Sequence, residues 1–337
     1  MGATYNSEIL IVGAGICGLM AATELVAAGY QVLVVDKEQT VGGRLATRGI
    51  GPGLADYGAQ FLTARDRRFA RHVAAWQDAG LIFQWSTGWS DGGMLRSLFD
   101  GHPRYATRGG MNALAKRLAA EIETAGGAIH TGARLALVRV DERGWRASDD
   151  EGNRYIAETL VLTPPVPQVL AMLDSGGVPL ARDERGVLQY IRYAPCLCGL
   201  FWIDGGVNLP EPGALQRREA DVGWIADNQR KGISPEATVV TVHAGPAWSR
   251  AHYDDDDGRV LSLLGAALRP WLASNATIRE AQIQRWRYAL PTILHSEPFL
   301  CAQGLPPLYI GGDAFGGPRV EGAALSGLAI AAAIKAR

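Results

Sequence analysis

A glycine-rich turn near the N-terminus has the residue types and spacing of a phosphate-binding loop. An apolar run, "EILIV", leads into Gly13, Gly15 and Gly18, and a helical stretch and a second apolar run then lead to Asp36. The first glycine permits a tight turn, the second lets the backbone approach a pyrophosphate, and the third lets the helix pack closely on the strand. Glycines also mark ordinary turns, but the strand, helix and acid around these three predict a dinucleotide site.

A second glycine-rich stretch with an acid lies at the other end of the chain. "YIGGDAFGGPRVEGAALSG", from Tyr309 to Gly327, is an apolar run, a turn that contains Gly312 and Asp313, and then glycines before an apolar helix. Asp313 read alone is equally well a turn acid that caps the helix. Together the two glycine sites favour a shared cofactor.

The turn after the second predicted strand carries a family resemblance. Gly42, Gly43 and Arg44 precede "DYGAQFLTARD", from Asp56 to Asp66. This order resembles the FAD-binding domain of the amine oxidase superfamily of flavoproteins, and the second string resembles its renalase-like branch, of bacterial type. Further matching segments spread the resemblance over nearly the whole chain: "GGM" at Gly109, "GWIADNQRK" at Gly223, "HAGPAWSR" at His243 and "QRWRYALP" at Gln284.

The resemblance implies FAD, bound non-covalently, as the cofactor. Asp313 is then expected to accept a hydrogen bond on the ribityl or ribose side, and the helix start after it to face the pyrimidine end of the flavin, where its partial positive charge stabilises the reduced ring. Arg44 is expected at the pyrophosphate, with a plain surface charge as the alternative, and Leu135 over the adenine, with a plain strand residue as the alternative. Cys17 is expected to be a small buried filler whose backbone touches FAD. The full cofactor set is Gly13, Gly15, Cys17, Gly18, Asp36, Lys37, Gly43, Arg44, Gln60, Phe61, Leu135, Gly312, Asp313, Arg319, Val320, Glu321 and Ala323.

The substrate is expected where the second domain covers the flavin. Aromatic residues are first of all core material, so each pocket assignment has a core residue as its alternative. Amine-oxidising relatives set a lysine and a water against the flavin, and Lys231 is the one lysine in a suitable segment, but "DNQRKG" predicts an exposed loop there. The substrate set is Thr63, Arg65, Arg108, Cys196, Trp224, Trp248, Trp286 and Tyr288.

Renalase-like proteins are associated with oxidation of mis-reduced nicotinamide nucleotides, 2- and 6-dihydroNAD(P), with dioxygen as the final acceptor and hydrogen peroxide as a product. A dihydropyridine expels hydride with the help of its own ring nitrogen, so no catalytic base is assigned. Geometry against flavin N5 is what the protein then supplies. The alternatives are an amine or polyamine oxidase, a flavin desaturase or porphyrinogen oxidase, and a non-enzymatic FAD protein.

Two domains are expected to position these groups. Residues 1–71, 104–163 and 290–337 are predicted to form an α/β, Rossmann-type FAD domain with a parallel central sheet. Residues 72–103 and 164–289 are predicted to form an α+β substrate domain with a mostly antiparallel sheet, because strand-like runs such as "TVVTVHAG" alternate with helical patterns. "TPPVPQ" at Thr163 is the predicted crossing.

Composition narrows the remaining possibilities. Thirty-three Lys and Arg balance 34 Asp and Glu in 337 residues, so a nucleic acid partner is not expected. The four cysteines lie outside paired or zinc-ligand spacings, no metal site is predicted, and the run from Asp254 to Asp257 is read as a solvated helix start. No signal segment or membrane span is predicted, which favours a cytoplasmic location.

Overall fold

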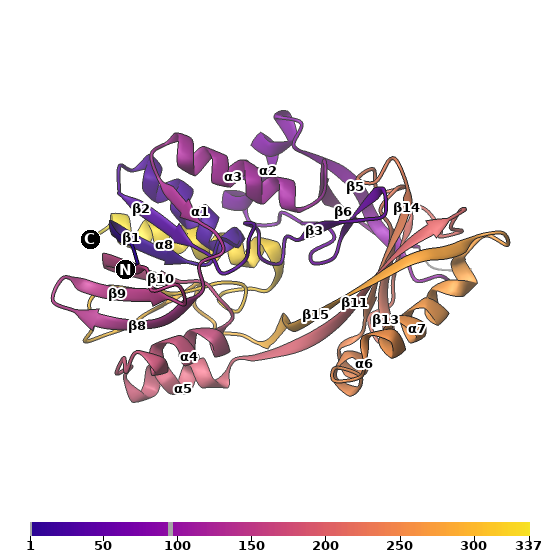
Figure 1. Ribbon diagram of the computed structural model, residues 1–337. Coiled ribbons are helices and arrows are strands. Elements are labelled where there is room, and N and C mark those ends of the chain that lie inside the picture. Colours follow the sequence, from indigo (N-terminus) through magenta and orange to yellow (C-terminus); the bar gives the residue numbers. More distant parts are fainter. Residues whose placement is uncertain (1, 94–96) are drawn as a thin grey trace. The chain divides into compact units, whose positions relative to one another are not determined.

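The computed structural model describes residues 2–93 and 97–337 (Figure 1). The chain forms two compact units. Unit 1 comprises Met1–Gly43, Ala115–Arg192 and Pro291–Arg337, and unit 2 comprises Arg44–Leu114 and Tyr193–Leu290.

A largely parallel sheet forms the centre of unit 1. Its main strand order is β16-β17-β10-β1-β2-β7, and the hairpin β8/β9 joins the sheet through β9, which pairs with β10. The pairs β10/β1, β1/β2, β2/β7 and β10/β17 are parallel. Strands buried on both faces read as continuous apolar runs, as "VLVV" in β2 does. The strands are β1 (Thr4–Val12), β2 (Val32–Val35), β7 (Ala128–His130), β8 (Leu135–Asp141), β9 (Gly144–Asp149), β10 (Arg154–Leu162), β16 (Leu300–Cys301) and β17 (Leu308–Ile310).

Helices α1 and α8 pack on each other beside this sheet (Figure 1). A Cβ at Gly327 of α8 would lie 2.1 Å from the carbonyl oxygen of Cys17 in α1, so only glycine permits this approach. Cys17 itself is buried, as expected of a small filler. The helices of unit 1 are α1 (Ile16–Ala27), α4 (Val166–Ser175), α5 (Arg182–Tyr190), α8 (Arg319–Lys335) and most of α3 (Asn112–Thr124).

Unit 2 is built on a seven-stranded sheet of order β15-β11-β14-β13-β12-β5-β6. The pairs β11/β14, β14/β13, β13/β12 and β5/β6 are antiparallel and β12/β5 is parallel, so the mostly antiparallel sheet is confirmed. Its strands are β5 (Ile82–Ser90), β6 (Ser97–Thr107), β11 (Arg192–Asp204), β12 (Ala214–Gln216), β13 (Val222–Asp227), β14 (Thr238–Ala244) and β15 (Thr277–Ile293). The hairpin β3 (Thr47–Ile50)/β4 (Gly53–Asp56) forms a separate two-stranded sheet.

The helices of unit 2 follow the predicted patterns. Asp256 is the N-cap of α7 and accepts a hydrogen bond from the backbone N–H of Arg259 at 2.9 Å, which confirms the acidic run as a helix start. Leu264 on the same helix is fully buried against Phe201 and other core residues. The helices are α2 (Arg67–Asp78), α6 (Pro246–Ala251), α7 (Asp257–Leu268) and the 3-10 turn η1 (Arg269–Trp271).

The compact units do not follow the expected domain boundaries. Residues 44–71 and 104–114 belong to unit 2, and residues 164–192 belong to unit 1. The proline-rich segment at Thr163 begins α4, which packs on β8 of the same sheet, and the chain crosses to unit 2 only at β11. The helices in the described part of the chain lack the length and apolar character needed to cross a bilayer.

Candidate cofactor and substrate sites

The first glycine turn has the geometry that its sequence predicts. Gly13 has φ +103° and Gly18 would carry a Cβ 2.0 Å from the Gly13 carbonyl oxygen, so neither position accepts a side chain without distortion. Gly15 caps α1 without a side-chain acceptor, and a Cβ built there would meet nothing within 4 Å. Open space therefore lies before the helix N-terminus, and this turn fits a dinucleotide phosphate.

Asp36 lies directly after β2, where the sequence predicts a ribose contact. Asp36 is 8% exposed, and its carboxylate accepts hydrogen bonds from the Ala14 N–H at 2.6 Å and from the Glu38 N–H at 2.8 Å. Burial raises the pKa of Asp36, and these two hydrogen bonds oppose that rise. Each oxygen keeps a second lone pair, so the carboxylate fits a ribose diol. Lys37 is exposed and pairs with Glu38.

The C-terminal motif reaches the same place in unit 1. A Cβ at Gly311 would lie 3.7 Å from Cys17 Sγ, and the Gly312 N–H donates to Ser326 Oγ of α8 at 2.9 Å. Burial raises the pKa of the Cys17 thiol to about 12, with a smaller rise from the nearby charge of Asp313. The structure therefore brings Asp313 and the first glycine turn together, as the paired motifs predicted.

The start of α8 is under backbone strain. Arg319 has φ +75°, which is outside the ordinary range of a residue with a side chain, and the N-cap residue Pro318 supplies no side-chain acceptor. Val320 and Ala323 are buried in the first turns and Glu321 is half-buried. Strained backbone at a helix N-terminus is common where a ligand is held, so the expected flavin contact here stays a prediction that the geometry suits.

Three other predicted cofactor residues, Gly43, Arg44 and Leu135, have well-defined surroundings. Gly42 donates from its N–H to the Ala14 carbonyl at 2.8 Å, and a Cβ at Gly43 would lie 3.5 Å from Gly15, so this turn lies beside the first one. The Arg44 guanidinium donates to the backbone carbonyls of Tyr288 and Ala289 at 3.1 and 3.3 Å. Leu135 begins β8 and is buried, as its strand alternative also requires. The pyrophosphate and adenine roles of these residues stay predictions.

The predicted substrate aromatics fall into separate groups within unit 2. Trp224 is buried among Phe61, Trp85 and Trp89, with ring centroids 4.9 Å from Trp89 and 5.7 Å from Phe61. Trp286 stacks on Tyr57 at 5.5 Å, Tyr288 meets Tyr193 edge-on, and Trp248 lies 4.2 Å from the His252 ring, against the α7 core. The structure does not gather the four into one cluster.

The polar substrate candidates lie mostly at the surface of unit 2. Arg65 is exposed before α2, Thr63 is half-buried two residues earlier, and the exposed Arg108 places its guanidinium 5.4 Å from the Phe83 ring. Burial raises the pKa of Cys196 in β11 to about 12, so it remains a neutral thiol. The substrate roles of these four residues also stay predictions.

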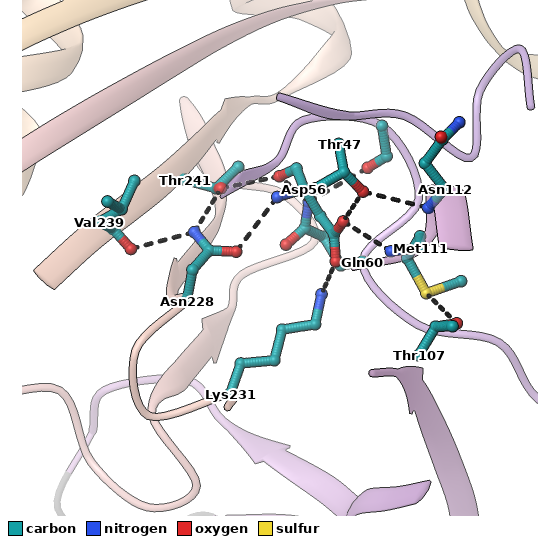
Figure 2. A network of polar contacts seen from close by, with 11 residues as sticks. Thr47, Asp56, Gln60, Thr107, Met111, Asn112, Asn228, Lys231, Val239 and Thr241 are labelled. Atoms are coloured by element: carbon teal, nitrogen blue, oxygen red, sulfur yellow. Dashed lines mark hydrogen bonds and ion pairs between the residues drawn. The ribbon is translucent and has the colours of Figure 1, made fainter. Parts of the chain in front are cut away.

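Lys231 is the clearest correction to the sequence analysis. Gln229, Arg230 and Gly232 in the turn between β13 and β14 are exposed as predicted, but the Lys231 side chain is 0% exposed. Nζ forms an ion pair with Asp56 Oδ2 at 2.5 Å (Figure 2). It also lies 5.0 Å from the Trp85 ring centroid. Asp56 is 175 residues away in sequence, so no local pattern in "DNQRKG" could reveal the partner that makes burial possible.

Comparison with known proteins identifies the family. Residues 11–76 match an NAD(P)-binding Rossmann-like domain, and residues 69–335 match the family described as flavin containing amine oxidoreductase. The chain belongs to this family. It is an FAD-dependent oxidoreductase with a Rossmann-type cofactor domain, and the expected fold class and cofactor are confirmed.

The individual relatives carry the names of several different activities. Mouse renalase is 21% identical over 353 residues, which cover 98% of this chain and 99% of renalase. A putative flavin-containing monoamine oxidase of Mycobacterium tuberculosis is 30% identical over 119 residues, or 28% of this chain and 26% of that protein. Putrescine oxidase bound to putrescine has the same fold, with a TM-score of 0.71 at 16% identity over 99% of this chain and 100% of that chain. A putative protoporphyrinogen oxidase from Exiguobacterium also reaches 0.71, at 14% identity over 100% and 99%.

Proposed function

We propose that this family member oxidises mis-reduced nicotinamide nucleotides, 2- and 6-dihydroNAD(P), to NAD(P)+. Its similarity to mouse renalase extends over nearly both whole chains, whereas its similarity to the mycobacterial monoamine oxidase covers about a quarter of each. When bound, FAD supplies the acceptor for the hydride, and dioxygen then takes the two electrons and yields hydrogen peroxide.

The state of Lys231 is the observation that carries this proposal. Lys231 is the one lysine in the sequence of unit 2, and its ammonium is fully buried against the Asp56 carboxylate. An ammonium that is paired with a carboxylate has no lone pair with which to take a proton from an amine. This favours a substrate that loses hydride without the help of a base.

His243 supports the same conclusion. Burial lowers its pKa to about 4, although a hydrogen bond with the backbone of Tyr57 opposes the fall, and the charge of Lys231 lowers it further. An imidazole with so low a pKa is a weak base at neutral pH. A dihydropyridine needs no base, because its ring nitrogen lone pair expels the hydride from carbon 2 or 6 and leaves an aromatic nicotinamide. The chain's own residues then only have to bind and orient the ring.

Anaerobic stopped-flow reduction of the bound flavin tests the proposal. We expect fast reduction by the 2- and 6-dihydro isomers, nearly constant between about pH 6 and 9, and slow reduction by ordinary NADH, whose hydride is on carbon 4. The amine or polyamine oxidase alternative, supported by the family description and the putrescine oxidase fold, predicts the opposite. Rapid reduction by an amine with a steep rise in rate with pH, and none by the isomers, would overturn the proposal. A flavin desaturase would respond to neither substrate class.

A further inference from the structure

The buried pair Lys231–Asp56 connects three segments of unit 2 (Figure 2). Asp56 ends β4, and its second carboxylate oxygen accepts hydrogen bonds from the Thr47 hydroxyl at 2.5 Å and from the Met111 N–H at 2.8 Å. The Asp56 N–H donates to Asn228 Oδ1 at 3.2 Å. One residue thus joins the β3/β4 hairpin, the turn before α3 and the turn between β13 and β14.

The space around this carboxylate is fully used. Gly110 has φ +94°, and a Cβ there would lie 2.4 Å from Thr47 and 2.9 Å from Asp56 Oδ1. The Asp56 carbonyl oxygen also accepts from Thr241 Oγ1 at 2.8 Å. Three donors and close packing therefore constrain the carboxylate, and the segments it joins share that constraint.

A buried ion pair of this kind is weak evidence for stability, because apolar side chains of similar size often serve as well. The segments that it joins suggest another role. Gln60 and Phe61 follow Asp56 by four and five residues, and Arg108 lies in the turn that Met111 ends; all three are predicted to contact cofactor or substrate.

Gln60 shows how the constraint reaches a predicted contact residue. Its Nε2 donates to the carbonyls of Asp56 at 2.7 Å and of Gly58 at 3.2 Å. Two carbonyl neighbours require the amide nitrogen on that side, so the amide orientation is settled by chemistry. Its Oε1 is buried and has no partner among residues 2–93 and 97–337, so the main-chain carbonyls of Asp56 and Gly58 fix the direction of an unused acceptor.

We infer that Lys231 and Asp56 are a positioning pair, which holds Gln60, Phe61 and the turn of Arg108 in one geometry for hydride transfer. Lys231 neutralises the buried carboxylate and packs against Trp85, whose ring meets Trp89 edge-on at 4.6 Å. Neither residue of the pair is assigned a contact with substrate or flavin. The inference rests on the proposed function for its substrate but not for its geometry.

The test uses the holoenzyme with the variant Lys231→Met and the double variant Lys231→Met with Asp56→Asn. The single change leaves an uncompensated buried carboxylate and threatens folding. In the double variant neither side chain is charged, and both are close in size to the side chains they replace. The side-chain oxygen that remains at position 56 can still accept hydrogen bonds from the Thr47 hydroxyl and the Met111 N–H. Leu264→Ala, in the α7 core, is the matched control for a loss of stability alone.

The readout is the limiting rate of anaerobic flavin reduction and the apparent substrate Kd, measured with both dihydro isomers. We expect the double variant to keep its FAD and to lose about ten- to a hundredfold in limiting rate, because small misplacements have effects of this size. The Kd should change by less than about threefold, and the rate ratio of the two isomers should shift. Leu264→Ala should change neither.

Two results would overturn the inference: a limiting rate within about twofold of wild type in the double variant, or an equal loss of rate in Leu264→Ala at the same loss of thermal stability. Failure of the proposed function is seen separately, as a wild-type flavin that neither isomer reduces. If an amine reduces the wild-type flavin instead, the same variants are compared with that amine, and the same two results decide the role of the pair.

Discussion

The two units of this flavoprotein position their polar groups by different means. Unit 1 relies on the backbone: three glycines, two helix N-termini without side-chain caps, and N–H groups that hold Asp36 from both sides. Unit 2 relies on charged and polar side chains buried around Asp56, with partners up to 185 residues away. The comparison shows that one site depends on the absence of side chains and the other on their presence.

Each unit should therefore be damaged by a different kind of substitution. An added methyl group is the damaging change in unit 1, because neighbouring backbone fills the space at Gly18 and Gly327 and the Thr163 hydroxyl fills it at Gly13. A lost charge is the damaging change in unit 2, because burial makes an unpaired carboxylate or ammonium unfavourable. The predictions below test this contrast.

The largest effect is expected for Gly18→Ala, with Gly15→Ala as its matched partner. The new Cβ at Gly18 would lie 2.0 Å from a carbonyl oxygen, whereas the one at Gly15 would meet open space in an ordinary φ of −77°. Chemical denaturation should show a loss of about 3 kcal/mol in the free energy of unfolding for Gly18→Ala. Gly15→Ala should leave this quantity within about 1 kcal/mol of wild type.

The same pair separates stability from binding. Gly15→Ala should still weaken FAD, because a methyl group there enters the space before the helix N-terminus. Titration of the folded apoprotein with FAD measures this. Equal stability of the two variants, or undiminished FAD affinity in Gly15→Ala, would contradict the backbone account of unit 1.

Asp36→Ala should weaken FAD binding by about ten- to a hundredfold. A charged hydrogen-bond acceptor contributes roughly 1.5 to 3 kcal/mol, and Asp36 also holds the Ala14 N–H of the glycine turn. Isothermal titration of the apoprotein gives the affinity, and circular dichroism checks that the chain remains folded. Unchanged affinity would leave Asp36 as a strand-end acid that only orders the turn.

The contrast also explains what the sequence could predict. The turn from Gly13 to Gly18, the acid at Asp36 and the C-terminal Asp313 are local patterns in which each residue has a defined backbone task, and the structure brings the three together. The fold class followed from them, whereas the family and FAD followed from the resemblance carried by the turn from Gly42 to Arg44 and the string from Asp56 to Asp66. The acidic start of α7 was predicted for the same reason, since a helix N-cap is a local signal.

Lys231 was misread because its environment is set by distant residues. The segment around Lys231, with Arg230 and Gly232 on either side, has the composition of an exposed turn. The ion pair with Asp56 is what allows the Lys231 side chain to be buried. The compact units differ from the predicted domains for a similar reason. Proline breaks the chain at Thr163, but the packing of α4 on β8 keeps the following helices in unit 1. Tertiary contacts override local signals in both cases.

Unit 2 should lose stability in mild acid through His243. Its pKa is lowered to about 4 in the folded chain by burial, against an ordinary value near 6.5. The folded state therefore binds fewer protons than the unfolded chain between these values. The contribution of His243 is fully present above about pH 6.5 and is lost as pH falls toward about 4, with a total of roughly 3 kcal/mol.

Denaturant unfolding at half-unit steps from pH 7.5 to 4 measures this slope. His243→Phe is the control, because it keeps an aromatic ring in β14 but has no titrating group. The variant should show a flatter pH dependence in this window. An equal slope in both proteins would assign the acid sensitivity to other groups.

The smallest effect concerns Arg319, and it separates backbone from side chain at the start of α8. Arg319 has φ +75°, a conformation that is unfavourable by about 1 kcal/mol for any residue with a Cβ. Arg319→Gly should therefore be about 1 kcal/mol more stable than Arg319→Ala in thermal unfolding, although both remove the guanidinium. If the N–H groups of this turn face the flavin, as predicted, both variants should also bind FAD with nearly wild-type affinity. A similar loss of FAD affinity in both variants would show that the Arg319 guanidinium, and not the backbone, contributes to FAD binding. Unit 1 would then depend on a charged side chain at this position, as unit 2 does at Asp56.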